Sequence, residues 1–145
     1  MKKIMNQKGF TLIELIVVIA IIGLLSTLAV VALGSARSKA RDSKRLSDLK
    51  QLQTALELFY TDKNVYPDGA GISLGTTDYA CLNTSGFTTT GCTDPYMGQV
   101  PSDPQTGTYV YTLNGDSYTV VASLEGDVNG LSDVIELTPA GIAKQ

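Results

Sequence analysis

Few side chains in this chain could carry catalysis or hold a metal. Histidine is absent, which removes the commonest general base near neutral pH and the commonest imidazole metal ligand. The two cysteines, Cys81 and Cys92, have no further Cys or His beside them to complete a tetrahedral zinc site. No pair of carboxylates stands in a recognisable catalytic arrangement. The sequence therefore predicts a protein that is not an enzyme.

Cys81 and Cys92 enclose a short polar loop. If this part of the chain is exported to an oxidising compartment, we expect the two thiols to form a disulfide, which would contribute about 3 kcal/mol in the chain-entropy model. In a reducing compartment they would remain free thiols.

A second group of polar residues, Asp127, Asn129 and Asp133, surrounds a glycine turn at Gly130. Their oxygens are ligands that calcium accepts, although the spacing lacks the full EF-hand pattern. An Asx-rich turn with solvated acids accounts for the same residues. We expect that no cofactor is required, and calcium at these three residues is the one metal that the sequence suggests.

The most unusual acid is Glu14, the one charged residue in the apolar stretch 10–33. As a helix this stretch would be about 36 Å long, which exceeds a hydrocarbon core of about 30 Å. A carboxylate costs about 2.5–3.5 kcal/mol at the bilayer centre and less near an interface. Glu14 therefore sits at headgroup depth, is neutralised, or has a cationic partner.

The nine residues before this stretch, MKKIMNQKG, are basic and contain no acid, as in a targeting leader. A secretory signal has an apolar region of about 7–15 residues, shorter than the stretch here. Its small-residue cleavage site would fall near Gly34 and Ala36, beyond a full membrane span. A plain signal anchor accounts for every feature except Glu14.

The segment KGFTLIE at 8–14 resembles the processing motif of type IV prepilins, and with the following LIVVIAIIG the match covers about fifteen residues. The resemblance implies that a membrane-embedded prepilin peptidase cleaves between Gly9 and Phe10 and methylates the new amino group of Phe10. It also assigns Glu14, the fifth residue of the mature chain, to filament assembly. Gly9 fits this assignment, because a residue without Cβ lets a peptidase approach the backbone.

Cleavage after Gly9 would create a cationic amine on Phe10, close to where Glu14 of a neighbouring subunit lacks a partner. Burying the Phe10 amine and the Glu14 carboxylate costs both groups their hydration, which offsets much of their attraction. The pair is therefore better interpreted as setting the axial register between neighbouring subunits than as adding a large net stability to the filament. In one respect the chain departs from the family. Many pilins have a helix-breaking proline where this chain has Val31, and its first proline is Pro67. We therefore expect the helix to remain continuous there.

Charge is segregated beyond the span. Residues 35–50 hold six Lys or Arg against two Asp, whereas residues 51–145 hold two Lys against eleven acids. The acidic head makes nucleic-acid binding unexpected. The basic cluster is expected either to contact lipid headgroups, with local pairs Asp42–Arg45 and Lys44–Asp48, or to face the acidic heads of neighbouring subunits. Its members are Arg37, Lys39, Arg41, Lys44 and Arg45.

The remaining sequence predicts a small head on the second half of the helix. Apolar residues recur at helical spacing at Leu46, Leu49, Leu52, Leu56 and Phe59. Strands are predicted at 108–113 and 117–124 around the turn Asn114-Gly115-Asp116, with a third at 134–138. The fold expected is α+β, a long N-terminal helix packed by its second half on an antiparallel sheet. The Tyr66-Pro67 pair and the proline-flanked Asp103 resemble the head of the major pseudopilin of type II secretion systems.

Four segments result: a leader at 1–9, a membrane and assembly half of the helix at 10–34, an amphipathic half at 35–60, and a head at 61–145. The leading hypothesis is a structural subunit of a type IV pilus-like filament that self-associates through its helices. The alternatives are a major pseudopilin of a type II secretion system and a membrane-tethered calcium- or ligand-binding module. The expected partners are the prepilin peptidase and an inner-membrane assembly machinery. The expected location is a single-pass inner membrane protein before assembly and an extracytoplasmic filament afterwards.

Overall fold

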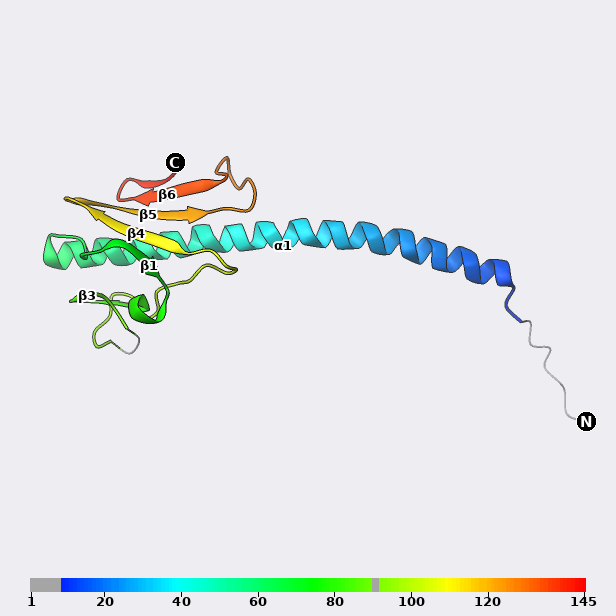
Figure 1. The fold of residues 1–145 in the computed structure, drawn as a ribbon, viewed down its shortest axis with the longest axis horizontal. Helices are drawn as coiled ribbons and strands as arrows, with labels where there is room; N and C mark the ends of the chain where they lie inside the picture. The colour runs from blue at the N-terminus through cyan, green and yellow to red at the C-terminus, as the bar shows by residue number, and fades with distance from the viewer. Residues whose placement is uncertain (1–8, 90–91) are drawn as a thin grey trace, which may run out of the picture. The chain divides into compact units, whose positions relative to one another are not determined.

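A computed structural model describes residues 9–89 and 92–145, so most of the predicted leader, residues 1–8, lies outside the described residues. The chain divides into two compact units, one up to Arg37 and one from Ser38 to Gln145. Helix α1 (Leu12–Lys63) is followed by the short 3₁₀ helix η1 (Thr77–Tyr79) and the strands shown in Figure 1. The strands are β1 (Ala70–Leu74), β2 (Cys81–Asn83), β3 (Gly86–Thr88), β4 (Tyr109–Asn114), β5 (Ser117–Ser123), β6 (Val134–Thr138) and β7 (Gly141–Lys144).

The first half of α1 is apolar on every face and exposed along its whole length. Its most apolar window of 18 residues has a mean hydropathy of 3.0 and is 0% buried, so the helix is long and apolar enough to cross a membrane. The helix remains continuous through Val31, as the missing proline predicted. Within this continuous stretch the Thr27 hydroxyl donates to the carbonyl of Leu24 at 2.8 Å.

The helix ends three residues later than the sequence predicted. Thr61, Asp62 and Lys63 continue the helical backbone, since none of them breaks it. Asn64 then adopts a left-handed conformation at φ 55°, and its N–H donates to the carbonyl of Tyr60 at 2.7 Å. Asparagine is one of the few residues that adopt this conformation readily at a helix C-terminus.

The head contains a five-stranded antiparallel sheet in the order β1-β4-β5-β6-β7. The predicted hairpin is confirmed: β4 pairs with β5 from Val110–Val121 to Asn114–Ser117, and the two-residue turn is Gly115-Asp116. Glycine suits this turn because Gly115 lies at φ 62°. The third predicted strand is confirmed as β6.

Strands β1, β2, β3 and β7 were not predicted, because their sequences lack a long alternating pattern. β1 contains Gly71 at φ 68°, where the register with β4 shifts by a bulge. β7 follows β6 through the two-residue turn Pro139-Ala140. β2 and β3 form a separate two-stranded ladder of three residue pairs.

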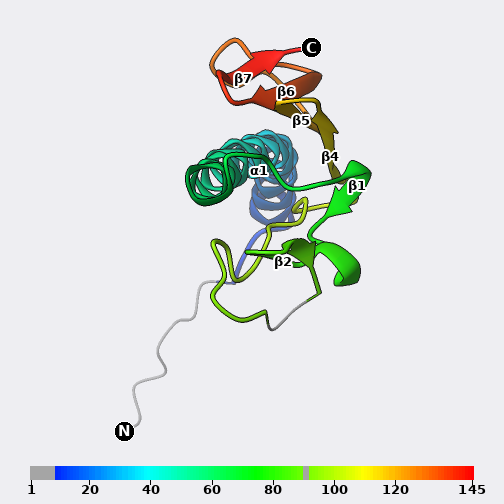
Figure 2. The same ribbon diagram turned by 90° about the vertical axis from the view of Figure 1, so that its left-hand side faces the viewer.

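The predicted helix stripe forms one side of the head core. Leu49, Leu52, Leu56 and Phe59 are buried and Leu46 is partly buried, which confirms the predicted face. Tyr109, Tyr111 and Tyr118 and the alternate residues of β5 and β6 pack against this stripe. Figure 2 shows the five-stranded sheet curving over one side of α1, with the segment that carries β2 on another side.

Leu52→Ala should destabilise the head by about 2–5 kcal/mol, because Leu52 is 0% exposed and its removal leaves a cavity in the core. The measurement is chemical denaturation of the full chain in detergent, followed by near-UV circular dichroism of the head tyrosines. Leu58→Ala is the matched control: Leu58 is 51% exposed, and its loss should change the free energy of unfolding by less than about 0.5 kcal/mol. Equal effects of the two substitutions would contradict this core.

Candidate assembly site and the charged contacts of the head

Thr11 and Glu14 form a reciprocal cap at the N-terminus of α1. The Thr11 backbone N–H donates to Glu14 Oε2 at 2.9 Å, and the Thr11 hydroxyl donates to the same oxygen at 2.6 Å. In return the Glu14 backbone N–H donates to Thr11 Oγ1 at 3.3 Å. This is a capping box, in which a threonine and a glutamate three residues later satisfy each other's backbone groups. The Thr-x-x-Glu spacing at 11–14 is the sequence signature of this cap.

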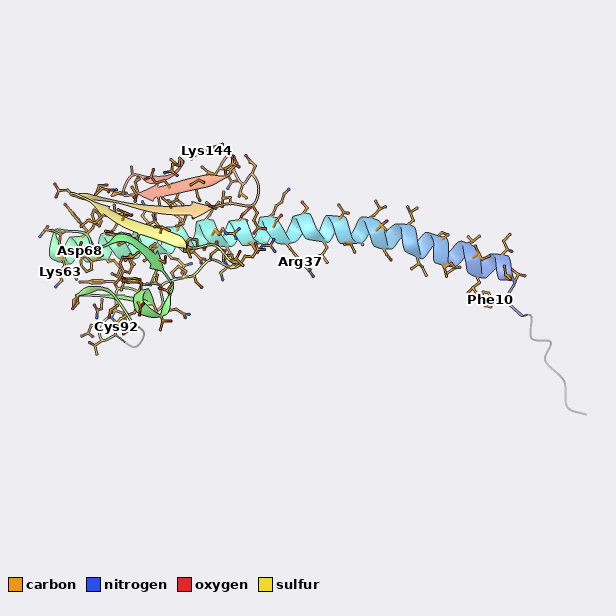
Figure 3. The ribbon with its side chains drawn as sticks, in the orientation of Figure 1. Phe10, Arg37, Lys63, Asp68, Cys92 and Lys144 are labelled. Carbon is orange, nitrogen blue, oxygen red and sulfur yellow. A yellow bond between two sulfur atoms is a disulfide. The ribbon has the colours of Figure 1, made fainter. Side chains whose placement is uncertain are left out.

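The capped carboxylate lies on an exposed apolar surface. Phe10 is 88% exposed, and Ile13, Glu14, Val17 and Val18 form with it an open groove of about 420 Å³. Figure 3 shows Phe10 at the start of α1, with the side chains of the first half of the helix projecting to all sides. Such a surface has to be covered by lipid or by other apolar helices, because water does not solvate it favourably.

Gly9 and Phe10, the two residues at the predicted cleavage point, precede the first helical residue. Both are exposed, and nothing lies within 4 Å of where a Gly9 side chain would project. The peptide bond between them is thus in non-helical backbone without cover from the described residues.

Arg45 forms the centre of a second polar site, of which the sequence predicted only the local pair with Asp42. Its guanidinium donates to Asp42 at 2.6 Å, to Asp103 at 2.6 and 3.0 Å, and to Glu125 at 2.7 Å. The side chains of Arg45, Asp42 and Asp103 are almost fully buried. Arg41 adds a two-point contact with Glu125 at 2.5 and 2.7 Å. We call these five residues the Arg45 network.

The Arg45 network ties two loops of the head to the helix. Asp103 comes from the loop before β4 and also accepts the backbone N–H groups of Gln105 and Gly107. Glu125 comes from the β5–β6 connection, where Asp42 accepts the backbone N–H groups of Glu125 and Gly126. On the N-terminal side of Leu46, the helix face that packs on the head therefore consists of the charged residues Asp42 and Arg45. Apolar spacing in the sequence does not reveal this part of the face.

These contacts set the pKa values of the acids. Hydrogen bonds from Arg41 and then Arg45 lower the pKa of Glu125 to about 2. The hydrogen bond from Arg45 lowers the pKa of Asp103. A charged donor favours the ionised carboxylate, so both acids remain charged under ordinary conditions.

Two predictions for the basic cluster have different outcomes. The local pair Asp42–Arg45 is confirmed, but Arg41 and Arg45 bind acids of their own head. The local pair Lys44–Asp48 is wrong for this structure, since no ion pair joins these two described residues. Asp48 instead accepts the hydroxyl of Tyr109 at 3.0 Å, and Lys44 acts on it only through longer-range attraction.

The predicted disulfide is confirmed between Cys81 and Cys92. Cys81 is the first residue of β2, and the bond closes the loop that contains the β2–β3 ladder. Residues 90–91 of this loop lie outside the described residues. A covalent closure suits a segment that has only three ladder pairs of its own.

The calcium prediction at Asp127, Asn129 and Asp133 stays a prediction. Asp127 accepts the backbone N–H of Gly130 at 3.2 Å, which closes a tight turn with Asn129 and Gly130 at positive φ. Asp133 pairs with Lys144 at 3.3 Å. In residues 9–89 and 92–145, no three His, Cys, Asp or Glu side chains gather in a way that could hold a metal.

Comparisons with known proteins match both parts of the chain. Residues 4–34 match the prokaryotic N-terminal methylation motif, and residues 32–133 match the family described as type II secretion system protein G. The chain belongs to the protein G family. No solved structure matched.

Relatives within the protein G family extend over most of the chain. A type II secretion system core protein G of Vibrio cholerae is 32% identical over 83% of this chain and 80% of its own length. The corresponding protein of Escherichia coli K12 is 31% identical over 97% of this chain and 95% of its own. A type IV major pilin of Myxococcus xanthus is 40% identical, but over 45% of this chain and 30% of its own length.

In this member of the protein G family, Arg45→Met should destabilise the head by about 3–5 kcal/mol. The substitution leaves Asp42 and Asp103 buried without their cation. Denaturation of the full chain in detergent gives the measurement. Lys50→Met is the matched control, because Lys50 is exposed and its ammonium group donates to Gln53 on the same helix. If both variants unfold at the same denaturant concentration, the network does not hold the head on the helix.

The acids of the Arg45 network should also make the head sensitive to low pH. Asp103 and Glu125 have lowered pKa values in the folded chain, Glu125 to about 2, so the stability they contribute is present above their unfolded values of about 4. It is lost as the pH falls from about 4 towards 2. Asp48 acts in the opposite direction, because burial raises its pKa. Unfolding measured across this range should depend less on pH in Asp103→Asn/Glu125→Gln than in the original chain, and an unchanged profile would contradict the assignment.

Proposed function

We propose that this chain is the major pseudopilin of a type II secretion system, a structural subunit that polymerises into a short filament beneath the outer membrane. The observation that carries the proposal is a helix exposed on all its apolar faces with one acid, Glu14, at its capped N-terminus. The family match over residues 32–133 supports the secretion filament over other pilin-like filaments, because it covers the head. The proposed role is structural, with no catalytic step and no nucleic-acid partner.

A surface type IV pilus is the second candidate. The Myxococcus xanthus pilin is 40% identical over 65 residues, a stretch shorter than the matches to the two full-length secretion relatives. The pilus and the pseudopilus share the same helix and the same processing step. They differ in the length of the filament and in the process that requires it, which is protein secretion for the pseudopilus and a cell-surface role for the pilus.

Processing prepares the assembly site. On this proposal a prepilin peptidase cuts between Gly9 and Phe10 and methylates the new amine. The exposed, non-helical backbone at this point supports the proposed cleavage. The methylated amine retains its positive charge, so it remains a partner for a carboxylate.

Assembly then exchanges one set of polar contacts for another. In the single chain the Glu14 carboxylate is held by two donors of Thr11, which lower the cost of placing it among apolar residues. In the filament the Phe10 amine of a neighbouring copy approaches Glu14 as the apolar helices leave the lipid and pack together. A copy in the wrong axial register leaves both charges unpaired, so the charge pair selects one register.

The location follows from the same elements. Before assembly the first half of α1 spans the inner membrane, and the head lies on the extracytoplasmic side, where its disulfide can form. An inner-membrane assembly machinery would move the subunit into the filament. For Asp127, Asn129 and Asp133 the proposal keeps both interpretations of the sequence, bound calcium or solvated acids.

Glu14→Leu should abolish filament formation while the chain is still made, cleaved and inserted in the membrane. The alkyl side chain suits the lipid but gives the incoming amine no partner. Filaments are collected by shearing from cells that overproduce the chain, and the N-terminus is read by mass spectrometry. Ile13→Leu, an apolar exchange at the adjacent residue, is the control and should assemble normally.

Three results would count against the proposal. One is a mature chain that retains residues 1–9, and another is normal polymerisation of the Glu14→Leu variant. The third concerns the choice between filaments. Loss of the chain should abolish secretion of folded proteins without loss of surface pili, and the reverse pattern would favour the surface pilus.

A further inference from the structure

The structure divides the basic cluster into two sets. Arg41 and Arg45 bind acids of their own head, and Lys44 attracts a buried carboxylate in the same unit. Arg37 and Lys39 are exposed, and within the part of the chain that the structure describes they make no ion pair or side-chain hydrogen bond. These two cations are therefore available to a partner outside the described chain.

Arg37 lies one helical turn beyond the last residue of the apolar stretch. That residue, Leu33, is 51% exposed, and Arg37 follows it four positions later in the same unit. At about 1.5 Å per residue, Arg37 lies about 6 Å further along the helix. The headgroup layer on either side of a hydrocarbon core is about 5–8 Å deep. With Leu33 at the edge of the core, Arg37 is therefore at the depth of the lipid phosphates.

Lys39 follows Arg37 two residues later in the same continuous helix. Its long alkyl stem allows the ammonium group to reach back towards the headgroups. Figure 3 shows Arg37 on α1, and the structure places it in the unit of the apolar half and not in the unit of the head. The surroundings of Arg37 are therefore those of the apolar half, which requires lipid or other apolar surfaces.

Phosphate is the anion that suits these two side chains. A guanidinium group donates two parallel N–H groups to two oxygens of one phosphate, and an ammonium group adds a compact charge. A basic residue at a membrane surface also favours lipids with a net negative charge, by about fivefold for each residue. A phospholipid that is anionic as a whole therefore fits Arg37 and Lys39 better than a zwitterionic one.

The two cations stand where they weaken the orientation of the chain in a membrane. Basic residues near a span favour the cytoplasmic side, and Lys2, Lys3 and Lys8 precede the span. Arg37 and Lys39 follow it and oppose that bias. Orientation therefore does not explain them, whereas binding of a lipid phosphate does.

We propose that Arg37, assisted by Lys39, binds the phosphate group of an anionic phospholipid in the extracytoplasmic leaflet before the subunit enters a filament. The inference rests on the proposed function, because it requires residues 10–33 to span the inner membrane. The contact fixes the depth of the helix in the bilayer. Withdrawal of the helix into a filament then has to break it.

The first test uses the fact that the chain contains three arginines, Arg37, Arg41 and Arg45. The full chain, labelled with ¹⁵N-arginine, is placed in vesicles of equal parts phosphatidylglycerol and phosphatidylcholine. Solid-state NMR then measures the coupling of the guanidinium nitrogens to lipid ³¹P. One arginine should couple to phosphorus, because the other two bind carboxylates of the head. Arg37→Gln should lose this coupling, and Lys50→Gln, an exposed lysine of the head unit, should keep it.

The second test identifies the lipid. The headgroup of phosphatidylglycerol carries ¹³C, and phosphatidylcholine is unlabelled. Coupling of the Arg37 nitrogens to this ¹³C should show that phosphatidylglycerol occupies the site more often than its share of the vesicle. Lys39→Gln should lower this enrichment about fivefold, which corresponds to the loss of one cation at the surface. Lys50→Gln should leave the enrichment unchanged.

The proposal is overturned if no arginine couples to phosphorus, if the coupling survives Arg37→Gln, or if phosphatidylglycerol is not enriched. An unchanged enrichment in Lys39→Gln also overturns it. Coupling of Arg37 to carboxylate carbons in place of phosphorus would instead assign it to an acidic side chain of a neighbouring subunit.

Glu14→Leu keeps this proposal distinct from the proposed function. That variant should retain the Arg37–phosphorus coupling although it forms no filaments, because the lipid contact precedes assembly. Normal filaments from Glu14→Leu, with the coupling present, would reject the filament proposal alone. A chain that forms normal filaments but shows no coupling in vesicles would reject the lipid contact alone.

Discussion

The structure depends on one constraint: the two halves of a single helix, α1, have to bury their apolar side chains in two different surroundings. Up to Leu33, α1 carries apolar side chains on every face, and none of them is covered by the rest of the described chain. From Ser38 onward the same helix buries one stripe under the sheet. The hydrophobic effect drives both halves, but only the second can be satisfied within a single chain. The first half requires lipid or other apolar surfaces to cover it.

The polar residues on the helix follow from that division. Glu14 is held by Thr11, so that a carboxylate can remain at the start of an apolar helix. Arg45 joins the helix to two loops of the head through three acids. Neither contact is a surface ion pair of the kind that contributes little to stability. The first satisfies the helix end, and the second replaces apolar packing where the stripe of leucines stops.

The sequence was sufficient to predict the elements with strong local signals. The apolar run, the leucine stripe, the Asn114-Gly115 hairpin and β6 depend on spacing within a few residues, and the structure confirms them. Of the Arg45 network only the local pair Asp42–Arg45 could be predicted, because Asp103 and Glu125 are distant in sequence and carry no periodic signal. β1 and β7 are short edge strands whose pairing depends on partners already in place. The Thr11–Glu14 cap has a readable Thr-x-x-Glu signature, whereas the explanations predicted for Glu14 were headgroup depth, neutralisation or a cationic partner.

The order of the strands in the sheet affects how the head folds. β4, β5, β6 and β7 are neighbours in the sheet in the same order as in the chain, each joined to the next by an antiparallel connection. Most pairings therefore close short loops, and a topology with such local contacts folds faster than one that joins distant segments. The head can thus form hairpin by hairpin, each strand pairing with the one that precedes it in the chain. Because each strand then remains unpaired only briefly, little time is available for aggregation or proteolysis before the fold is complete.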